Sequence, residues 1–267
     1  MSRTRLLRRL AFVFATICIL LVGWYSFSAP KTLTIAVGPS DSTQYQFVHA
    51  SARALKDTQQ SFRLKIVPEK DSASASKSLD NHKVDLAVLR SDDNTSSEAR
   101  SLAIIHKRSV LLVTRRGTGI ASVSDLKGRS TAIVSHPGES NRALIDRMFQ
   151  HFGSSPEELS MQEISTRDLA QSQTRYDAYI VVTEATQGGP KAVFEAIAGP
   201  EKADLQFIGM PAPEGLVLRF RELQKSTIPV GAFGGTPPSP AVPVDTVAIT
   251  YELAATDDLS QTEATDL

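Results

Sequence analysis

The chain has 267 residues, enough for one large domain or for two lobes with cores of their own. It carries 29 Lys and Arg against 29 Asp and Glu, so no basic field points to a nucleic-acid partner. Its single cysteine, Cys18, excludes an intrachain disulfide, a cysteine-based zinc site and thiol catalysis in the rest of the chain.

An uncharged, apolar run occupies Leu10–Phe27. It is just long enough to cross a bilayer as a helix, and it follows four arginines: Arg3, Arg5, Arg8 and Arg9. By the positive-inside rule we expect residues 1–29 to form a cytoplasmic basic tip and an uncleaved signal-anchor helix, with the rest of the chain outside the cytoplasmic membrane. A signal peptide cleaved near Ala29 is the alternative, because small residues flank that position.

From Lys31 onward, strand patterns alternate with helix patterns. Strands are predicted at Leu33–Val37, Phe62–Val67, Val84–Leu89, Leu102–Ile105, Val110–Thr114, Ser130–Val134, Met161–Ile164, Asp177–Thr183, Leu205–Ile208 and Thr246–Tyr251. Helices are predicted at Gln46–Leu55, Lys77–Asn81, Ile120–Gly128, Ser140–Phe152, Thr166–Gln173, Lys191–Ala198 and Glu214–Gln224. A basic turn, His106–Arg108, separates the fourth and fifth strands, and the Pro/Gly-rich stretch Ile228–Pro243 precedes the last strand.

This alternation is typical of an α/β protein with a largely parallel sheet. The chain contains two similar series of alternating strands and helices, which predicts two α/β lobes. We expect the first lobe at residues 30–114, with 245–267 returning to it. The second lobe then covers residues 115–244 and includes the Pro/Gly-rich crossover.

Polar loops follow several of these strands, at the edge of an open sheet where ligands bind. They are Ser40–Tyr45, Asp71–Ser76, Arg90–Asp92 and Ser135–Arg142. Thr43 with Gln46 fits a capping box at a helix start, and a helix N-terminus favours anions. Arg142 can offer a paired fork to a carboxylate, although a solvated helix residue is an equally good interpretation. The candidate ligand-binding residues are Ser40, Ser42, Thr43, Tyr45, Ser72, Ser91, Ser140, Asn141 and Arg142.

Catalytic and metal-binding motifs are missing from the sequence. It contains no nucleophile elbow, no Walker loop, no dinucleotide fingerprint and no zinc-protease helix, and its five histidines show no metal spacing. Asp85 and Asp177 each begin a strand, the end opposite to the polar loops, so we expect them to be structural. We therefore expect no enzyme activity, no cofactor and no metal.

The combination of motifs resembles the TAXI family of TRAP transporter solute receptors, which are NMT1-like periplasmic binding proteins. The segments that carry the resemblance are Thr34–Tyr45, Val84–Asp92, Ser124–Gly128, Pro137–Arg142 and Ile228–Pro238. The last of these is similar to a passage of the membrane-anchored branch. Glu139 replaces a small residue of the family loop, and the chain stops earlier at its C-terminus than the family does.

The resemblance implies a two-lobed periplasmic-binding-protein-like fold of type II, preceded by the transmembrane helix. It implies an extracytoplasmic receptor that captures a small organic acid or amino acid through a carboxylate and delivers it to TRAP membrane permease subunits. A non-transporting sensor, or a truncated remnant of such a receptor, is the alternative. An enzyme that uses the same cleft is a third possibility, disfavoured by the missing acid–base residues.

Overall fold

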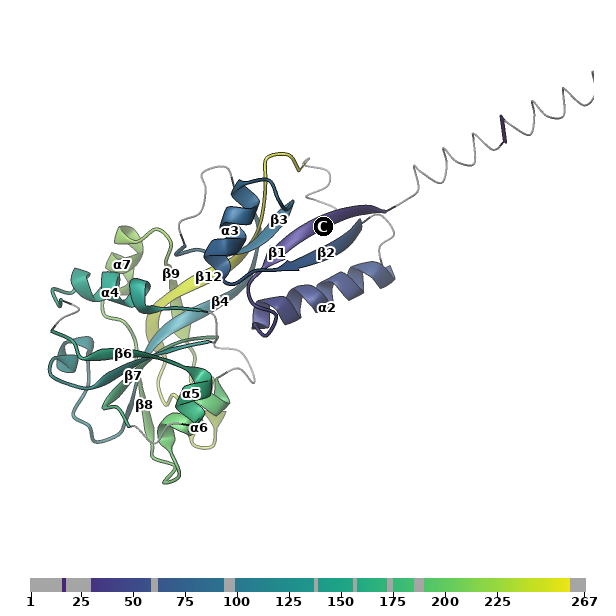
Figure 1. Ribbon diagram of the computed structural model, residues 1–267. Coiled ribbons are helices and arrows are strands. Elements are labelled where there is room, and N and C mark those ends of the chain that lie inside the picture. The colour runs from purple at the N-terminus through teal and green to yellow at the C-terminus, as the bar shows by residue number, and fades with distance from the viewer. Residues whose placement is uncertain are drawn as a thin grey trace, which may run out of the picture.

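Two long antiparallel strands organise the fold: β4 (Arg100–Arg115) and β12 (Val244–Ala255). They pair from Arg100 with Ala255 to Ser109 with Ala248. In the computed structural model, the described residues are 16–17, 30–58, 62–93, 99–136, 139–155, 158–171, 175–184 and 190–259. Within these residues, ten strands form one mixed, curled sheet whose main order is β2-β1-β3-β12-β4-β7-β5-β6. Because β4 and β12 lie at its centre, they connect the two ends of the sheet (Figure 1).

One end of the sheet, the first wing, consists of three parallel strands and two helices. The strands are β1 (Lys31–Val37), β2 (Phe62–Pro68) and β3 (Leu86–Arg90), and the helices are α2 (Thr43–Thr58) and α3 (Ser72–Asp80). The last strand, β3, pairs antiparallel with the C-terminal half of β12.

The other end, the second wing, is built around β4 from Ser109 onward. Its strands are β5 (Thr131–Ser135), β6 (Met161–Ser165), β7 (Ala178–Thr183) and β8 (Leu205–Ile208). Its helices are α4 (Arg142–His151), α5 (Thr166–Gln171), α6 (Lys191–Ala198) and α7 (Pro213–Arg219), with a 3-10 turn at Val123–Leu126. Strand β9 (Gln224–Ile228) pairs with the start of β12, and the short β10 (Gly234–Gly235) and β11 (Pro238–Ser239) form a hairpin.

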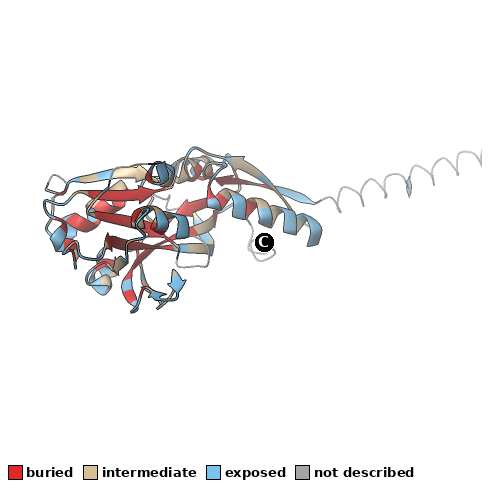
Figure 2. Cartoon of the chain, turned by 90° about the horizontal axis from the view of Figure 1, so that it is seen from below, coloured by how far each residue is buried: buried red, intermediate tan, exposed pale blue. Residues whose placement is uncertain are grey.

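The hydrophobic core is continuous between the wings. A single cluster of buried side chains includes Leu33 and Leu86 of the first wing and Leu112, Ile133 and Phe149 of the second. Figure 2 shows that burial follows the strands, whereas the helices keep an exposed outer face. Strands β3 and β7 are buried along their whole length, as strands covered on both faces should be.

In each wing, an aspartate at the start of one strand accepts hydrogen bonds from a residue of the neighbouring strand segment. Asp85 accepts hydrogen bonds from the Thr34 amide at 2.6 Å and from its hydroxyl at 2.7 Å. Asp177 does the same for Ser130, at 2.9 and 2.8 Å. These bonds from Ser130 lower the pKa of Asp177. Each carboxylate fixes the register of two neighbouring strands, which confirms the structural role expected for both aspartates.

The basic turn predicted at His106–Arg108 is wrong. These residues lie inside β4, where they pair with Tyr251, Thr250 and Ile249 of β12. Three polar residues in a row are typical of a turn, but β12 supplies main-chain hydrogen-bonding partners that hold them in a strand. The expected boundary between the lobes at residue 114 therefore falls at the end of a strand that both wings share.

Several helix boundaries also differ from the prediction. Helix α3 begins at Ser72 rather than near Lys77, because the Asp71 side chain caps it by accepting from the Ser74 amide. The helix predicted to reach Gln224 ends at Arg219, and Gln224 instead begins β9. The helix predicted from residue 120 to 128 is only a single 3-10 turn.

The predicted membrane-spanning run, Leu10–Phe27, lies outside the described residues apart from Thr16 and Ile17. In the part of the chain that is described, no helix combines the length and the apolar character needed to cross a bilayer.

We predict that Gly209→Ala destabilises the protein by about 2 kcal/mol or more, because overpacking of this kind typically costs about 1–3 kcal/mol. Gly209 follows β8, and a Cβ at this position would lie 1.8 Å from the main-chain oxygen of Asp245 on β12. The matched control is Gly215→Ala in α7, where a Cβ meets nothing within 4 Å. Alanine favours a helix by about 0.5–1 kcal/mol over glycine, so this variant should be neutral or more stable. Equal thermal unfolding midpoints for the two variants would contradict this account of the β8–β12 contact.

Candidate functional site

Charged and aromatic side chains meet where the two wings join. Arg108 lies on β4, Tyr251 lies on β12, and Arg90 ends β3. Arg90 and Arg108 are only 4% and 2% exposed. The Arg108 guanidinium lies 4.8 Å from the centre of the Tyr251 ring, on which His106 stacks at 4.5 Å. Buried guanidinium groups need acceptors, so their partners decide what this site can do.

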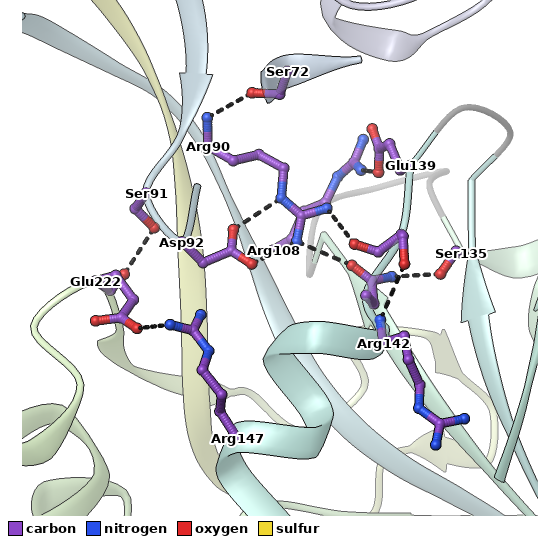
Figure 3. A network of polar contacts seen from close by, with 12 residues as sticks. Ser72, Arg90, Ser91, Asp92, Arg108, Ser135, Glu139, Arg142, Arg147 and Glu222 are labelled. Atoms are coloured by element: carbon purple, nitrogen blue, oxygen red, sulfur yellow. Dashed lines mark hydrogen bonds and ion pairs between the residues drawn. The ribbon is translucent and has the colours of Figure 1, made fainter. Parts of the chain in front are cut away.

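Arg108 is paired with a carboxylate from the second wing. Glu139, in the loop before α4, accepts from Arg108 Nη1 at 2.6 Å through Oε2 (Figure 3). Its Oε1 accepts from Gln44 Nε2 at 3.1 Å. Arg108 Nη1 also donates to the Tyr251 hydroxyl at 3.1 Å. Burial alone would raise the pKa of Glu139, but the charges of Arg108 and Arg90 outweigh burial and lower the pKa. The carboxylate is therefore ionised at neutral pH.

The hydroxyl of Tyr251 stays protonated at neutral pH. Burial and the negative charge of Glu139 raise its pKa well above the usual value. Tyr251 can therefore donate one hydrogen bond towards an anion while it accepts one from Arg108.

Arg90 joins the end of β3 to the start of α4. Its Nε and Nη2 each donate to the Asp92 carboxylate at 2.9 Å, in a paired arrangement. Its Nη1 donates to the Ser140 main-chain oxygen at 3.3 Å, and its Nη2 to Asn141 Oδ1 at 3.2 Å. The two wings are thus linked by Arg90 as well as by Glu139.

The start of α4 is organised by Glu163 of β6. This carboxylate accepts from the Ser135 hydroxyl, from the Ser140 hydroxyl at 2.8 Å and from the Asn141 amide at 2.7 Å. Asn141 Nδ2 donates in turn to Ser135 Oγ at 3.0 Å. The hydrogen-bond donors at this helix start already have an acceptor within the protein.

A small cavity remains beside Glu139. Its volume is about 20 Å³, and its lining consists of Gly38, Pro39, Gln44, Ser72, Val88, Arg90, Glu139 and Tyr251. That is room for about one water molecule, whereas sites for small-molecule ligands usually measure about 300–1,000 Å³.

The first candidate loop contributes differently from the prediction. Ser42 caps α2, since its Oγ accepts from the Tyr45 amide at 3.1 Å, so the predicted cap at Thr43 is wrong by one residue. Ser40 and Thr43 are exposed, and Tyr45 is half-buried, with its ring stacked on His49 at 6.1 Å. The side chain of this loop region that reaches Glu139 is Gln44.

Of the other candidates, Ser72, Ser140 and Asn141 belong to the network around Arg90, and Ser72 Oγ accepts from the Arg90 amide at 3.0 Å. Ser91 instead bonds to the Glu222 main-chain oxygen at 2.7 Å and to the Thr250 amide at 3.0 Å. The Arg142 side chain points away from Arg90 and Arg108 (Figure 3). It donates to Asp146 at 2.8 Å and to the Met161 main-chain oxygen at 2.9 Å.

Five central residues were not among the candidate ligand-binding residues: Gln44, Arg90, Arg108, Glu139 and Tyr251. Arg90 and Glu139 lie within predicted polar loops. The sequence signal for Arg108 was the basic interruption between two apolar runs, which we interpreted as a turn. Gln44 lies within the predicted polar loop Ser40–Tyr45 but was not chosen, and Tyr251 ends a predicted strand whose pattern gives no sign of a polar partner. Among the residues that the structure describes, no group of His, Cys, Asp and Glu side chains is arranged to hold a metal ion.

Comparison with known proteins identifies the family. The family model described as NMT1/THI5 like matches residues 58–198, just over half of the chain. The chain belongs to the NMT1/THI5-like family. No curated protein matches the sequence.

Two solved structures illustrate the similarity of fold. HinK, a LysR family transcriptional regulator from Pseudomonas aeruginosa, aligns with a TM-score of 0.50 at 10% identity, over 99% of this chain and 77% of its own. The periplasmic aliphatic sulphonate binding protein SsuA from Escherichia coli aligns with a TM-score of 0.42 at 15% identity, over 57% of this chain and 54% of its own. The match therefore spans about half the length of SsuA. Family membership supports a solute-binding role with a small-molecule ligand.

We predict that Glu139 stabilises the protein at neutral pH and loses this effect in acid. A carboxylate with a lowered pKa contributes stability above its ordinary pKa of 4.5, and this stability is lost as the pH falls through the lower folded-state value. Glu139→Gln should therefore be less stable than wild type by about 1.5–3 kcal/mol at pH 7, the worth of a charged hydrogen bond. The difference should shrink below about pH 4.5.

The measurement is denaturant unfolding of both proteins from pH 3 to pH 8. The control is Glu158→Gln, which removes an exposed carboxylate paired with Lys127 at 3.4 Å and should change stability little. A difference between wild type and Glu139→Gln that stays constant with pH would show that the Glu139 charge has no such role.

Proposed function

We propose that this protein is the extracytoplasmic solute-binding subunit of a TRAP-type transporter, and that it captures a small organic acid or amino acid between its wings. The observation that carries the proposal is the buried meeting point of Arg108, Gln44 and Tyr251. Arg108 and Gln44 donate to one carboxylate group, and Arg108 also donates to the Tyr251 hydroxyl beside it. Family membership supports solute binding, and the donors of Arg108 and Gln44 already hold a carboxylate, which favours an acid as the solute.

Strands β4 and β12 cross from one wing to the other, and we call them the crossing strands. They provide a hinge about which the two wings can open. In the described chain, the wings are connected along the backbone through β4 and β12. We propose that residues 30–114 with 245–267, and residues 115–244, move as two lobes about these strands. A solute that contacts Arg108 on β4 and the α4 loop at the same time would favour the closed arrangement, because only that arrangement offers both contacts.

The N-terminal sequence supports a location in the cytoplasmic membrane. We propose that Leu10–Phe27 anchors the protein in the cytoplasmic membrane, with the arginines inside and the binding domain in the periplasm or extracellular space. There it would hand its solute to the TRAP permease subunits.

A ligand sensor, or a remnant of a receptor that no longer transports, is the second candidate. The specific observation in its favour is the cavity of about 20 Å³, which has no space for a solute while Glu139 keeps its position. A screen of solutes against the purified protein tests the remnant, because a remnant should bind none of the solutes.

We predict that a thermal-shift screen of small organic acids on the full chain identifies a stabilising ligand. A ligand present at about 100 times its dissociation constant adds about 2.7 kcal/mol to the free energy of unfolding, which raises the unfolding midpoint by roughly 5–10 °C for a domain of this size.

Arg108→Lys should weaken binding of that ligand about tenfold or more, because an ammonium group lacks the planar fork and loses a charged hydrogen bond of about 1.5–3 kcal/mol.

The matched control is Arg142→Lys, the same substitution at the arginine that the sequence predicted as the ligand contact. Its guanidinium lies with Asp146 and Met161, so binding should be unchanged. Weaker binding by Arg142→Lys together with unchanged binding by Arg108→Lys would restore the sequence-based assignment and remove Arg108 from the site.

We also predict that the N-terminal segment is retained in the mature protein. N-terminal sequencing of protein from the membrane fraction should begin at or near Met1. A sequence that begins near Ala29 or Pro30 would identify a cleaved signal peptide and refute the anchor.

A further inference from the structure

The carboxylate of Glu139 lies where the carboxylate of a solute would have to lie. It contacts Arg108 on a crossing strand and Gln44 at the start of α2, although its own backbone belongs to the second wing. Its side chain is 10% exposed, so the contact is shielded from water. A carboxylate of this protein thus makes the contacts between wings that the proposed function assigns to a ligand.

Glu139 is separate from the groups that hold the start of α4. Ser135, Ser140 and Asn141 are bound by Glu163, and Arg90 contacts Ser140 and Asn141 rather than Glu139. The Glu139 side chain can therefore leave Arg108 and Gln44 without breaking a hydrogen bond that organises the helix start.

Space and charge restrict what could replace Glu139. The neighbouring cavity of about 20 Å³ is too small for an organic acid, so a solute has to take the volume that the Glu139 side chain now fills. Arg90, the cationic residue in the cavity lining, is already in a paired contact with Asp92. A second negative charge on the solute would therefore find no cation of its own in this lining and would lie near Asp92.

We infer that Glu139 is a built-in occupant of the solute site, which an entering monocarboxylate displaces by exchanging one carboxylate for another on Arg108 and Gln44. This inference rests on the proposed function, and it adds the regulation of the site and the charge class of its solute. The exchange conserves the net charge of the site. Because Glu139 is tethered beside Arg108, its effective concentration is in the millimolar range or higher, and it lowers the apparent affinity for solute.

Chemical rescue tests the inference. Glu139→Ala removes a group equivalent to acetate and leaves its volume beside Arg108. We expect acetate and propionate to raise the thermal unfolding midpoint of the full-length variant by roughly 3–6 °C at about ten times their dissociation constants. Wild type should bind these acids at least about tenfold more weakly, because its own carboxylate competes. Succinate should rescue less than propionate.

Three controls test whether the stabilisation by acetate and propionate comes from a carboxylate bound to Arg108. Acetamide, which has the shape of acetate but no charge, should not rescue Glu139→Ala. Asp146→Ala, which removes a carboxylate paired with Arg142 at 2.8 Å, should not respond to acetate. Adding Arg108→Gln to Glu139→Ala should abolish the rescue. If Glu139→Ala does not fold, Glu139→Gln is measured instead, and it should bind propionate at least about threefold more tightly than wild type because a neutral amide competes less well for Arg108.

The outcomes separate this inference from the proposed function. Equal binding of propionate by wild type and by the Glu139 variants, or binding by neither, would overturn the built-in occupant even if another organic acid proves to be a solute of the wild-type protein. Rescue of Glu139→Ala would support the occupant even if the screen of wild type finds no solute, and in that case the proposed transport function alone would fail.

Discussion

The ion pair between Arg108 and Glu139 is the contact on which the arrangement of the two wings depends. A guanidinium that is 2% exposed cannot remain unpaired, because an isolated buried charge costs far more than most single contacts contribute. Its nearer carboxylate partner, Glu139, comes from the second wing, as does Glu184 at 3.6 Å from Nε, while Gln44 holds Glu139 from the first wing. The burial of one charge on a central strand therefore favours the arrangement in which the two wings are together.

Two carboxylates at the junction have different tasks. Glu163 satisfies donors within the second wing and holds the start of α4 in place. Glu139 instead satisfies donors that belong to β4 and α2. The carboxylate that holds the start of α4 is therefore not the one that links the wings. A change at Glu139 can alter the contact between the wings without unfolding α4.

The crossing strands explain how a polar site can lie at the centre of a largely apolar fold. Strands β4 and β12 satisfy each other's main-chain groups along their shared length, so their side chains can be charged or aromatic without loss of the strand. His106, Arg108 and Tyr251 use this freedom and gather at one point between the wings.

The sequence by itself determined most strands and the alternating α/β order, because apolar patterns report directly which segments are buried. It also determined the structural role of Asp85 and Asp177, because each begins a strand at the end opposite to the polar loops. It misread His106–Arg108 as a turn, placed Gln44 in a polar loop without making it a candidate, and gave no sign of Tyr251. The reason is distance along the chain: Glu139 is 31 residues from Arg108 and 95 from Gln44, and Tyr251 is 143 from Arg108. A local pattern shows that a residue is polar, but whether that residue is solvated or buried against a partner is decided only when the tertiary structure brings the partner to it.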